Sequence, residues 1–131
     1  MTNDRYYQKC ITFGRAAEGL RADFQAQLKE MQCEIGFQYV RFHGLFHDDM
    51  AVYSETDGQV QLWFGYVDDL LDFLLENGLK PILELGFCPG ALAANAETLF
   101  WWNAHTCPPK DYDIGTIAIT KKPLPKAIEA R

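Results

Sequence analysis

The stretch LRADFQAQLKEMQCEIGFQYVRFHG, residues 20–44, predicts a helix that is followed directly by a strand. Its first part places apolar residues three and four positions apart, which gives a helix one apolar face. Those positions are Leu20, Phe24, Leu28, Met31 and Ile35. Gly36 suits the end of that helix, and the aromatic run 37–43 is typical of a strand. A helix that leads directly into a strand indicates an α/β fold.

The same alternation extends in both directions along the chain. The further elements expected are a strand at 6–13, a helix at 66–77, a strand at 80–87 and a small β-hairpin formed by 51–54 and 60–63. The hairpin is expected because Asp57-Gly58 between its two halves is a strong turn signal. Strands that alternate with amphipathic helices indicate a parallel sheet or a barrel.

The composition of the 131 residues limits the classes of function. Apolar residues make up 48% and charged residues 23%, which is typical of a globular domain. The net charge of −6 argues against a nucleic-acid partner, because phosphate binding needs a basic surface. No apolar run reaches the ~18–20 residues that would cross a bilayer, and no apolar leader follows Met1. A cytoplasmic location without a membrane partner is therefore expected.

The four cysteines give no sign of a metal or redox site. Cys10, Cys33, Cys88 and Cys107 form no CxxC pair, which argues against a zinc knuckle or a thioredoxin-type centre. They are expected to be reduced, partly buried and packed as small apolar side chains. No cofactor is predicted.

Five stretches of the sequence, in this order, carry a resemblance to one known family. They are Gly14-Arg-Ala-Ala-Glu-Gly-Leu-Arg-Ala-Asp-Phe-Gln25, Arg41-Phe-His-Gly-Leu-Phe-His-Asp-Asp-Met50, Val67-Asp-Asp-Leu-Leu-Asp-Phe-Leu-Leu75, Pro81-Ile-Leu-Glu-Leu-Gly-Phe87, and Phe100-Trp-Trp102 with Pro108-Pro-Lys-Asp-Tyr112. Together they resemble glycoside hydrolase family 39, the β-xylosidase type. The resemblance implies that residues 1–113 are the N-terminal part of a (β/α)8 TIM barrel, about its first three βα units with the hairpin as an insert. Residues 114–131 depart from the family and form a divergent tail.

The resemblance also implies a chemistry that this chain does not complete. The family hydrolyses glycosidic bonds with retention by means of two glutamates, one of which lies in an Asn-Glu-Pro motif. This sequence contains no Asn-Glu pair, so no acid/base and no nucleophile is nominated. The chain is expected to resemble a fragment of a retaining β-xylosidase that is inactive alone, with xylo-oligosaccharide as its ligand. The alternative is a non-catalytic sugar-binding or interaction module made from half a barrel.

Several residues are expected at the C-terminal ends of the strands, where the active sites of such barrels lie. By the resemblance, His43 would hydrogen-bond sugar hydroxyls, with His47, Asp48 and Asp49 just beyond it. Aromatic candidates for stacking on a sugar are Phe87, Trp101 and Trp102. The open alternatives are a structural histidine and aromatic residues that fill a core or an interface. A metal site at His43, His47 and Asp48 is not predicted, because the spacing matches no known motif.

Two charged residues lie inside apolar strand segments. Arg41 and Glu84 occupy comparable places in successive strands, and a buried charge needs a partner. A buried ion pair between them is predicted; the alternative is two separate charges at strand ends. Three strands cannot close a barrel, so open edges are also expected. We expect the exposed apolar surface to be buried in one of two ways. Either copies of the chain associate through these edges, or the tail 114–131 packs over an open edge.

Overall fold

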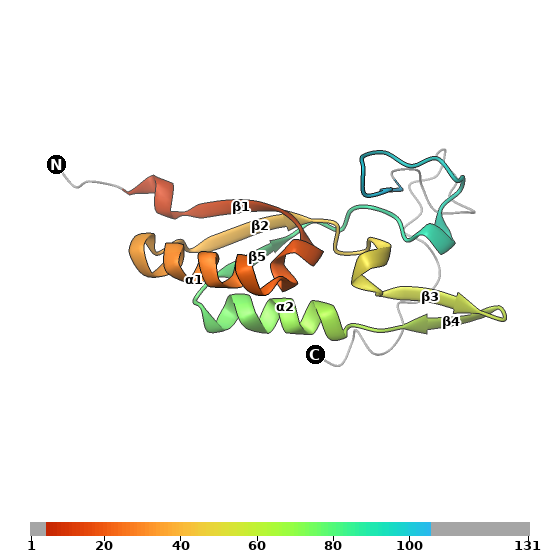
Figure 1. Cartoon of the computed structure of the whole chain (residues 1–131), viewed down its shortest axis with the longest axis horizontal. Coiled ribbons are helices and arrows are strands. Elements are labelled where there is room, and N and C mark those ends of the chain that lie inside the picture. Colours follow the sequence, from red (N-terminus) through yellow and green to blue (C-terminus); the bar gives the residue numbers. More distant parts are fainter. Residues whose placement is uncertain (1–4, 106–131) are drawn as a thin grey trace.

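The computed structural model describes residues 5–105. It contains a three-stranded parallel sheet in the order β1-β2-β5, formed by Cys10–Arg15, Tyr39–His43 and Lys80–Leu83. Helices α1 (Ala22–Ile35) and α2 (Gly65–Glu76) both lie on one face of this sheet (Figure 1). The predicted alternation of helices with parallel strands is confirmed. Cys107, the stretch 108–112 and the tail 114–131 lie outside the described residues.

The hydrophobic core lies between the sheet and the two helices. In β2, Val40 and Phe42 are almost fully buried, whereas Tyr39 and Arg41 between them are exposed. Alternate residues of a strand point to opposite faces, so Val40 and Phe42 face the helices. The helices cover them with side chains that include Leu28, Val67, Leu70, Phe73 and Leu74. One face of the sheet is therefore a packed core and the other is bare.

The helix ends follow from local sequence. Helix α1 stops at Gly36, whose φ of 75° is the left-handed conformation that glycine adopts without strain. Helix α2 agrees with the predicted range to within one residue at each end. On this helix Phe73 is buried, whereas Leu75 is exposed. Across the described residues, no helix combines the length and the apolar character that crossing a bilayer requires.

The first strand was predicted too early. Tyr6–Gln8 forms a turn of 3-10 helix, and β1 begins only at Cys10. The reason is the partner strand, because β2 begins at Tyr39 and Tyr39 is the register partner of Cys10. The residues after β1 form a second 3-10 helix, Ala16–Leu20, so α1 starts at Ala22 rather than at Leu20.

The insert after β2 is a short helical turn followed by a hairpin. The 3-10 helix Asp48–Met50 leads into β3 (Tyr53–Thr56) and β4 (Gln59–Leu62), which pair in an antiparallel register. Asp57 and Gly58 have φ values of 51° and 72°, as a two-residue hairpin turn of type I′ requires. The predicted hairpin is therefore confirmed, with each strand moved by one or two residues.

Gly19 allows η2 (Ala16–Leu20) to pack directly on α2. A Cβ at this position would lie 2.5 Å from Cδ1 of Leu70 and 3.2 Å from the ring of Phe13. Both neighbours belong to the packed core, so they cannot move aside freely. We expect Gly19→Ala to lower the free energy of unfolding by about 1–3 kcal/mol through overpacking. Urea unfolding followed by circular dichroism measures this change.

Gly86 provides the control for this substitution. A Cβ there would meet no other described atom within 4 Å. Gly86→Ala should leave the urea midpoint nearly unchanged. Equal midpoints for the two variants would show that Gly19 does not sit in a rigid contact.

Candidate functional site

The side chains named from the sequence gather where β1 and β2 end. Arg15 closes β1 and His43 closes β2, and the two are register partners in the parallel pair. The segment after His43 and the long segment 84–105 both pass over this end of the sheet (Figure 1). Parallel strands bring their carboxyl ends to the same edge, which is the usual position of a binding site in α/β folds.

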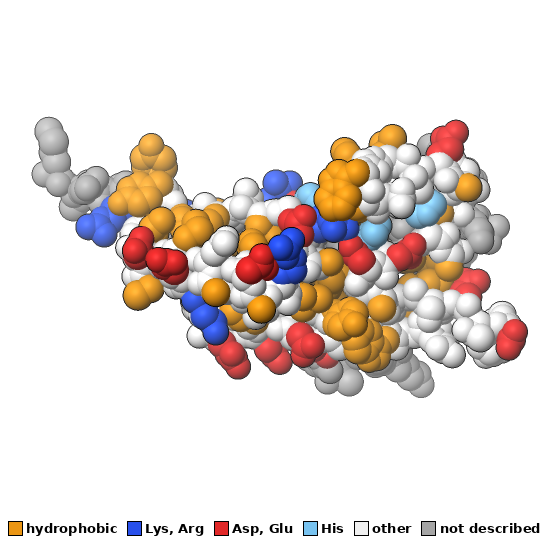
Figure 2. Space-filling model, viewed as in Figure 1, with side chains coloured by type: hydrophobic (Ala, Val, Ile, Leu, Met, Phe, Trp, Pro, Cys, Tyr) orange, Lys and Arg blue, Asp and Glu red, His pale blue; other side chains and the backbone are white. Residues whose placement is uncertain are grey.

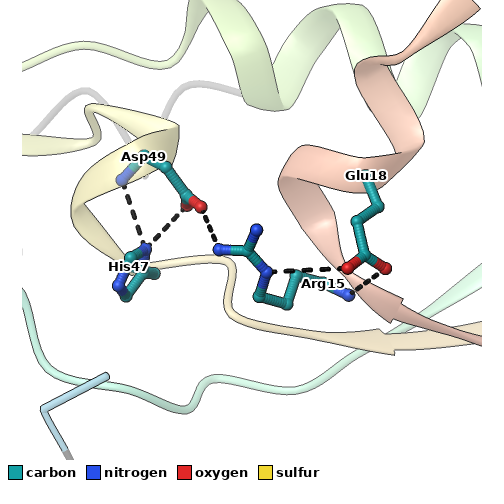
Figure 3. Close-up of polar contacts among 4 residues, drawn as sticks. All are labelled: Arg15, Glu18, His47 and Asp49. Carbon is teal, nitrogen blue, oxygen red and sulfur yellow. Dashed lines mark hydrogen bonds and ion pairs between the residues drawn. The ribbon is translucent and has the colours of Figure 1, made fainter. Parts of the chain in front are cut away.

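Arg15 connects three parts of this region (Figure 3). Its guanidinium Nη1 contacts Oδ2 of Asp49 at 2.5 Å, and its Nε lies 3.7 Å from Oε1 of Glu18. Its backbone N–H also donates to the Glu18 carboxylate at 3.1 Å. The Arg15 side chain is only 15% exposed. A cation this buried needs such partners, and it fixes η2 and η3 (Asp48–Met50) against the end of β1.

His47 completes this polar network. Its Nδ1 lies 2.8 Å from Oδ1 of Asp49 and 3.3 Å from the backbone nitrogen of Asp49. One ring nitrogen cannot donate to the first and accept from the second at the same time. The shorter contact is the stronger hydrogen bond, so we assign Nδ1 as the donor to the carboxylate. His47 is buried and held in place, which makes it a structural member of the network.

Asp48 ties the long segment 84–105 to the insert. Its Oδ1 accepts a hydrogen bond of 2.8 Å from the backbone N–H of Gly90. A Cβ at Gly90 would lie 2.6 Å from the same carboxylate, so a larger residue would break the close approach. The far end of the segment is held by a backbone hydrogen bond from Cys88 to His105. Asp48 therefore acts as an anchor for the backbone.

Trp102 lies at the centre of an aromatic cluster. Its ring is parallel to that of Phe100, with centroids 5.4 Å apart, and nearly parallel to that of His43 at 5.8 Å. Phe87 and His47 approach it edge-on, both at 4.9 Å. The guanidinium carbon of Arg15 lies 4.9 Å from its centroid, within the range of a cation–π contact. We refer to Phe87, Phe100, Trp102, His43 and His47 as the Trp102 cluster.

Two members of the cluster have unusual backbones. Phe87 and Phe100 have φ values of 62° and 64°, in the left-handed region that bulky residues rarely adopt. Such strain persists only where surrounding contacts hold it, and it is concentrated at functional sites. Here the two rings meet edge-on, and Trp102 contacts both of them, with Phe87 edge-on and Phe100 stacked in parallel. Both residues with a strained backbone therefore place their rings against Trp102.

At this site, one nitrogen of the His43 ring has no hydrogen-bond partner within residues 5–105. Its Nδ1 is buried and, among the described residues, makes no hydrogen bond. A buried polar group without a partner is unfavourable by about 1–3 kcal/mol, and such groups in native structures call for an explanation. The Nδ1 of His105 and the Nε of Arg15 are also buried without a hydrogen bond among the described residues, although Arg15 has ion-pair partners. His43 is the one of the three whose ring belongs to the Trp102 cluster.

The predicted pair of Arg41 and Glu84 is formed on the bare face of the sheet. Nε of Arg41 lies 2.8 Å from Oε1 of Glu84. The predicted burial of this pair is wrong, because the Arg41 side chain is 55% exposed. The Glu84 side chain is 33% exposed, so the two charges meet in partly aqueous surroundings. An ion pair of this kind stabilises a fold by only about 0–1 kcal/mol.

Comparisons with known proteins decide the family. Residues 2–116 match the family model described as Glycosyl hydrolases family 39. The chain belongs to glycosyl hydrolase family 39. A β-xylosidase of Caldicellulosiruptor saccharolyticus is 41% identical over 111 residues, which are 84% of this chain and 23% of that protein. A β-xylosidase of Geobacillus stearothermophilus is 39% identical over 108 residues, which are 79% of this chain and 21% of that protein.

Solved structures of family 39 members agree with the fold. A β-xylosidase from Caulobacter crescentus superposes with a TM-score of 0.76 at 39% identity, over 82% of this chain and 24% of that structure. The family 39 enzyme from Xanthomonas axonopodis pv. citri gives a TM-score of 0.75 at 37% identity, over 81% and 21%. This family 39 chain therefore spans between a fifth and a quarter of the length of these relatives.

Arg15 and Phe100 of the candidate site were not predicted from the sequence. Arg15 was quoted only within the family resemblance, although its position directly after a strand glycine could have indicated a site residue. Both Trp101 and Trp102 were predicted to stack on a sugar, yet Trp101 is 83% exposed, and its ring centroid lies 5.3 Å from the guanidinium carbon of Arg15. Phe100 was not predicted to stack on a sugar.

Within residues 5–105, no group of three or more His, Cys, Asp or Glu side chains is placed to hold a metal.

The cysteines of this family 39 chain differ from expectation. Cys10 and Cys33 are exposed thiols, and Cys88 is half-buried. The prediction of partly buried, packed side chains is therefore wrong for the first two. Cys10 lies on the bare face of the sheet and Cys33 on the outer side of α1, so neither has a layer to pack against.

Proposed function

We propose that this chain forms one wall of a sugar-binding site of the β-xylosidase type, with a xylose unit of a xylo-oligosaccharide as its ligand. The observation that carries the proposal is the buried Nδ1 of His43, which lies in the Trp102 cluster and has no hydrogen-bond partner within residues 5–105. In this proposal residues 1–113 are the first three βα units of a (β/α)8 barrel, and the site lies at the carboxyl ends of its strands.

The chemistry of the cluster supports a neutral, hydroxyl-rich ligand. Pyranose rings present C–H groups to aromatic faces and hydroxyl groups to hydrogen-bonding side chains. Phe87 supplies aromatic surface within the cluster, the exposed Trp101 supplies it beside the cluster, and His43 supplies a nitrogen that needs a partner. The cation of Arg15 is already neutralised by Asp49 and Glu18. An uncharged ligand therefore suits the site better than an anion does.

We further propose that these 131 residues do not hydrolyse glycosides alone. Retaining hydrolysis needs two carboxyl groups about 5–5.5 Å apart across the scissile bond. The carboxylates near the site are engaged in structural contacts. Asp48 binds the backbone of Gly90, Asp49 binds Arg15 and His47, and Glu84 binds Arg41. Their engagement supports a binding role.

His43→Ala tests the proposed binding role. We expect the variant to bind xylose about tenfold more weakly than the unaltered chain, which corresponds to the loss of one hydrogen bond to a buried nitrogen. Calorimetric titration with xylose measures this change, and an aryl β-xyloside assay of the unaltered chain should show no turnover. Tyr39→Ala, on the same strand face but away from the cluster, should bind as before.

Two results would contradict the proposal. Equal xylose affinity for His43→Ala and the unaltered chain would remove His43 from the site. Turnover of the aryl β-xyloside by the pure chain would show that two of its carboxylates are catalytic after all.

A second candidate function is an interaction module. Strands β1 and β5 each lack a neighbour on one side among the described residues, and Ile82, Leu83 and Leu85 near β5 are exposed apolar residues. Free edges with apolar side chains favour pairing with another chain. Sedimentation of Leu83→Lys/Leu85→Lys beside the unaltered chain tests this function. A monomer in both cases would exclude association through β5.

A further inference from the structure

The hairpin formed by β3 and β4 extends away from the parallel sheet as an arm (Figure 1). Every residue of β4 is exposed, and so are the last three residues of β3. A two-stranded hairpin without a covering layer is only marginally stable in water. Neither face of this arm contributes to the core, so its side chains are available to contact a ligand.

One face of the arm carries only uncharged hydrogen-bonding side chains. Ser54 pairs with Gln61 across the two strands, and Thr56 pairs with Gln59. Residues two apart in a strand share a face, so these four side chains lie together. The opposite face is different in character, with Val60, Leu62 and a hydrogen bond from the Tyr53 hydroxyl to Glu55. That hydrogen bond raises the pKa of Tyr53 to about 12.

Trp63 extends this uncharged face with an aromatic ring. Its backbone N–H donates to the carbonyl of Val52 at 3.1 Å, so the strand pairing continues by one residue beyond β4. The alternation then places Trp63 on the same face as Gln59 and Gln61. Trp63 is 48% exposed and meets the ring of Tyr66 edge-on, with centroids 4.7 Å apart.

The Trp63 ring is held in position although half of it contacts water. It lies against Gly65, where a Cβ would come within 2.1 Å of the ring. The contact with Gly65 and the contact with Tyr66 together limit the movement of the indole. Figure 2 shows hydrophobic side chains gathered next to a hairpin arm whose side chains are mostly neither hydrophobic nor charged. We call Ser54, Thr56, Gln59, Gln61, Trp63 and Tyr66 the hairpin face.

We propose that the hairpin face is a second carbohydrate site that binds a neutral polysaccharide chain outside the Trp102 cluster. Amide and hydroxyl side chains hydrogen-bond sugar hydroxyls, and a fixed, half-exposed indole offers a surface for a pyranose ring. The strip from Gln59 to Trp63 is about 13 Å long, enough for more than one sugar unit. The choice of xylan as the polysaccharide rests on the proposed function, whereas the site itself rests on the hairpin alone.

The absence of charge on this face decides between the candidate ligands. The chain as a whole carries a net charge of −6, yet none of the six residues is ionised at neutral pH. An anionic or cationic partner would find no countercharge there. A protein partner would bind more favourably to the opposite face, where Val60 and Leu62 are exposed apolar residues that it could bury. A neutral chain of sugars matches the hairpin face.

Affinity electrophoresis through soluble xylan tests the proposal with the full 131-residue chain. We expect Trp63→Ala to bind xylan at least about tenfold more weakly, as is common when a central aromatic contact is removed. Trp63→Phe should retain most of the binding. The double variant Gln59→Ala/Gln61→Ala leaves the aromatic pair intact and should also weaken binding. Tyr6→Ala removes an aromatic residue that is 75% exposed at the other end of the sheet and should bind as the unaltered chain does.

The outcomes separate this proposal from the proposed function. If Trp63→Ala and the double variant both bind xylan normally, the hairpin site is overturned. If His43→Ala abolishes xylan binding while Trp63→Ala does not, all sugar binding belongs to the Trp102 cluster and the hairpin site is likewise overturned. If Trp63→Ala loses xylan binding but keeps its xylose affinity, two separate sites are established. Binding of the unaltered chain to a β-glucan gel but not to xylan, lost in Trp63→Ala, would support the hairpin site and contradict xylan as its ligand.

Discussion

Phe42→Ala is expected to remove a large share of the free energy of unfolding of the protein. Phe42 is 1% exposed and lies at the centre of the core, stacked on Phe13 with centroids 5.0 Å apart. Removing a fully buried aromatic side chain lowers the free energy of unfolding by about 3–5 kcal/mol. A domain of this size has only about 5–15 kcal/mol in total, so the loss takes a large share of it. Urea unfolding monitored by circular dichroism measures the effect.

Tyr39→Ala is the matched control for Phe42→Ala. Tyr39 belongs to the same strand but lies on the bare face, where it is 39% exposed. Its loss should shift the urea midpoint far less than the loss of Phe42. Similar shifts for the two variants would mean that the sheet has no single buried face, contrary to the fold described above.

Arg15→Met should give the second largest effect. The substitution removes the cation between Asp49 and Glu18 and leaves the Asp49 carboxylate with His47 as its side-chain partner. Removing one partner of a buried ion pair lowers the free energy of unfolding by about 3–5 kcal/mol. Because the carboxylates of Asp49 and Glu18 are about one third exposed, water screens part of this loss, and we expect about 2–4 kcal/mol. The cation–π contact with Trp102 is lost as well. Near-ultraviolet circular dichroism should therefore show a weaker tryptophan signal.

Arg21→Met provides the comparison for a surface charge. Arg21 pairs with Asp23 at 2.7 Å, but both side chains are more than half exposed. The pairing raises the pKa of Arg21 and lowers that of Asp23, although solvent screens the interaction. Neither the urea midpoint nor the tryptophan signal should change appreciably. A change as large as that of Arg15→Met would show that burial does not distinguish the two arginines.

The sequence predicted the order of elements because that order depends on local patterns. The stripe from Leu20 to Ile35, Gly36 as a helix end and Asp57-Gly58 as a turn each act within a few residues. Strand limits were less accurate, because a strand is defined by its partner. Lys80–Leu83 pairs with β2, whereas the expected continuation to Phe87 does not, since β2 ends at His43 and Gly44 turns away with a φ of 75°.

The candidate site was predictable in its location but not in its contacts. The ends of the strands indicated His43, His47 and Asp48, and the structure places all three there. Which of two adjacent tryptophans turns inward depends on the left-handed backbones of Phe100 and Asn103, which no local pattern indicates. Arg15 resembles an ordinary surface charge until Asp49, 34 residues later, is placed beside it.

The central position of β2 has a consequence for the motion of the backbone. Among the described strands, β2 alone has a hydrogen-bonded neighbour on each side. Its amide hydrogens should therefore exchange with deuterium most slowly, while those of β1 and β5 that point outward from the sheet exchange quickly. A polypeptide that docked beside either outer strand would slow that exchange along the whole strand. Exchange rates at these two strands would thus reveal which side of the sheet receives further chain.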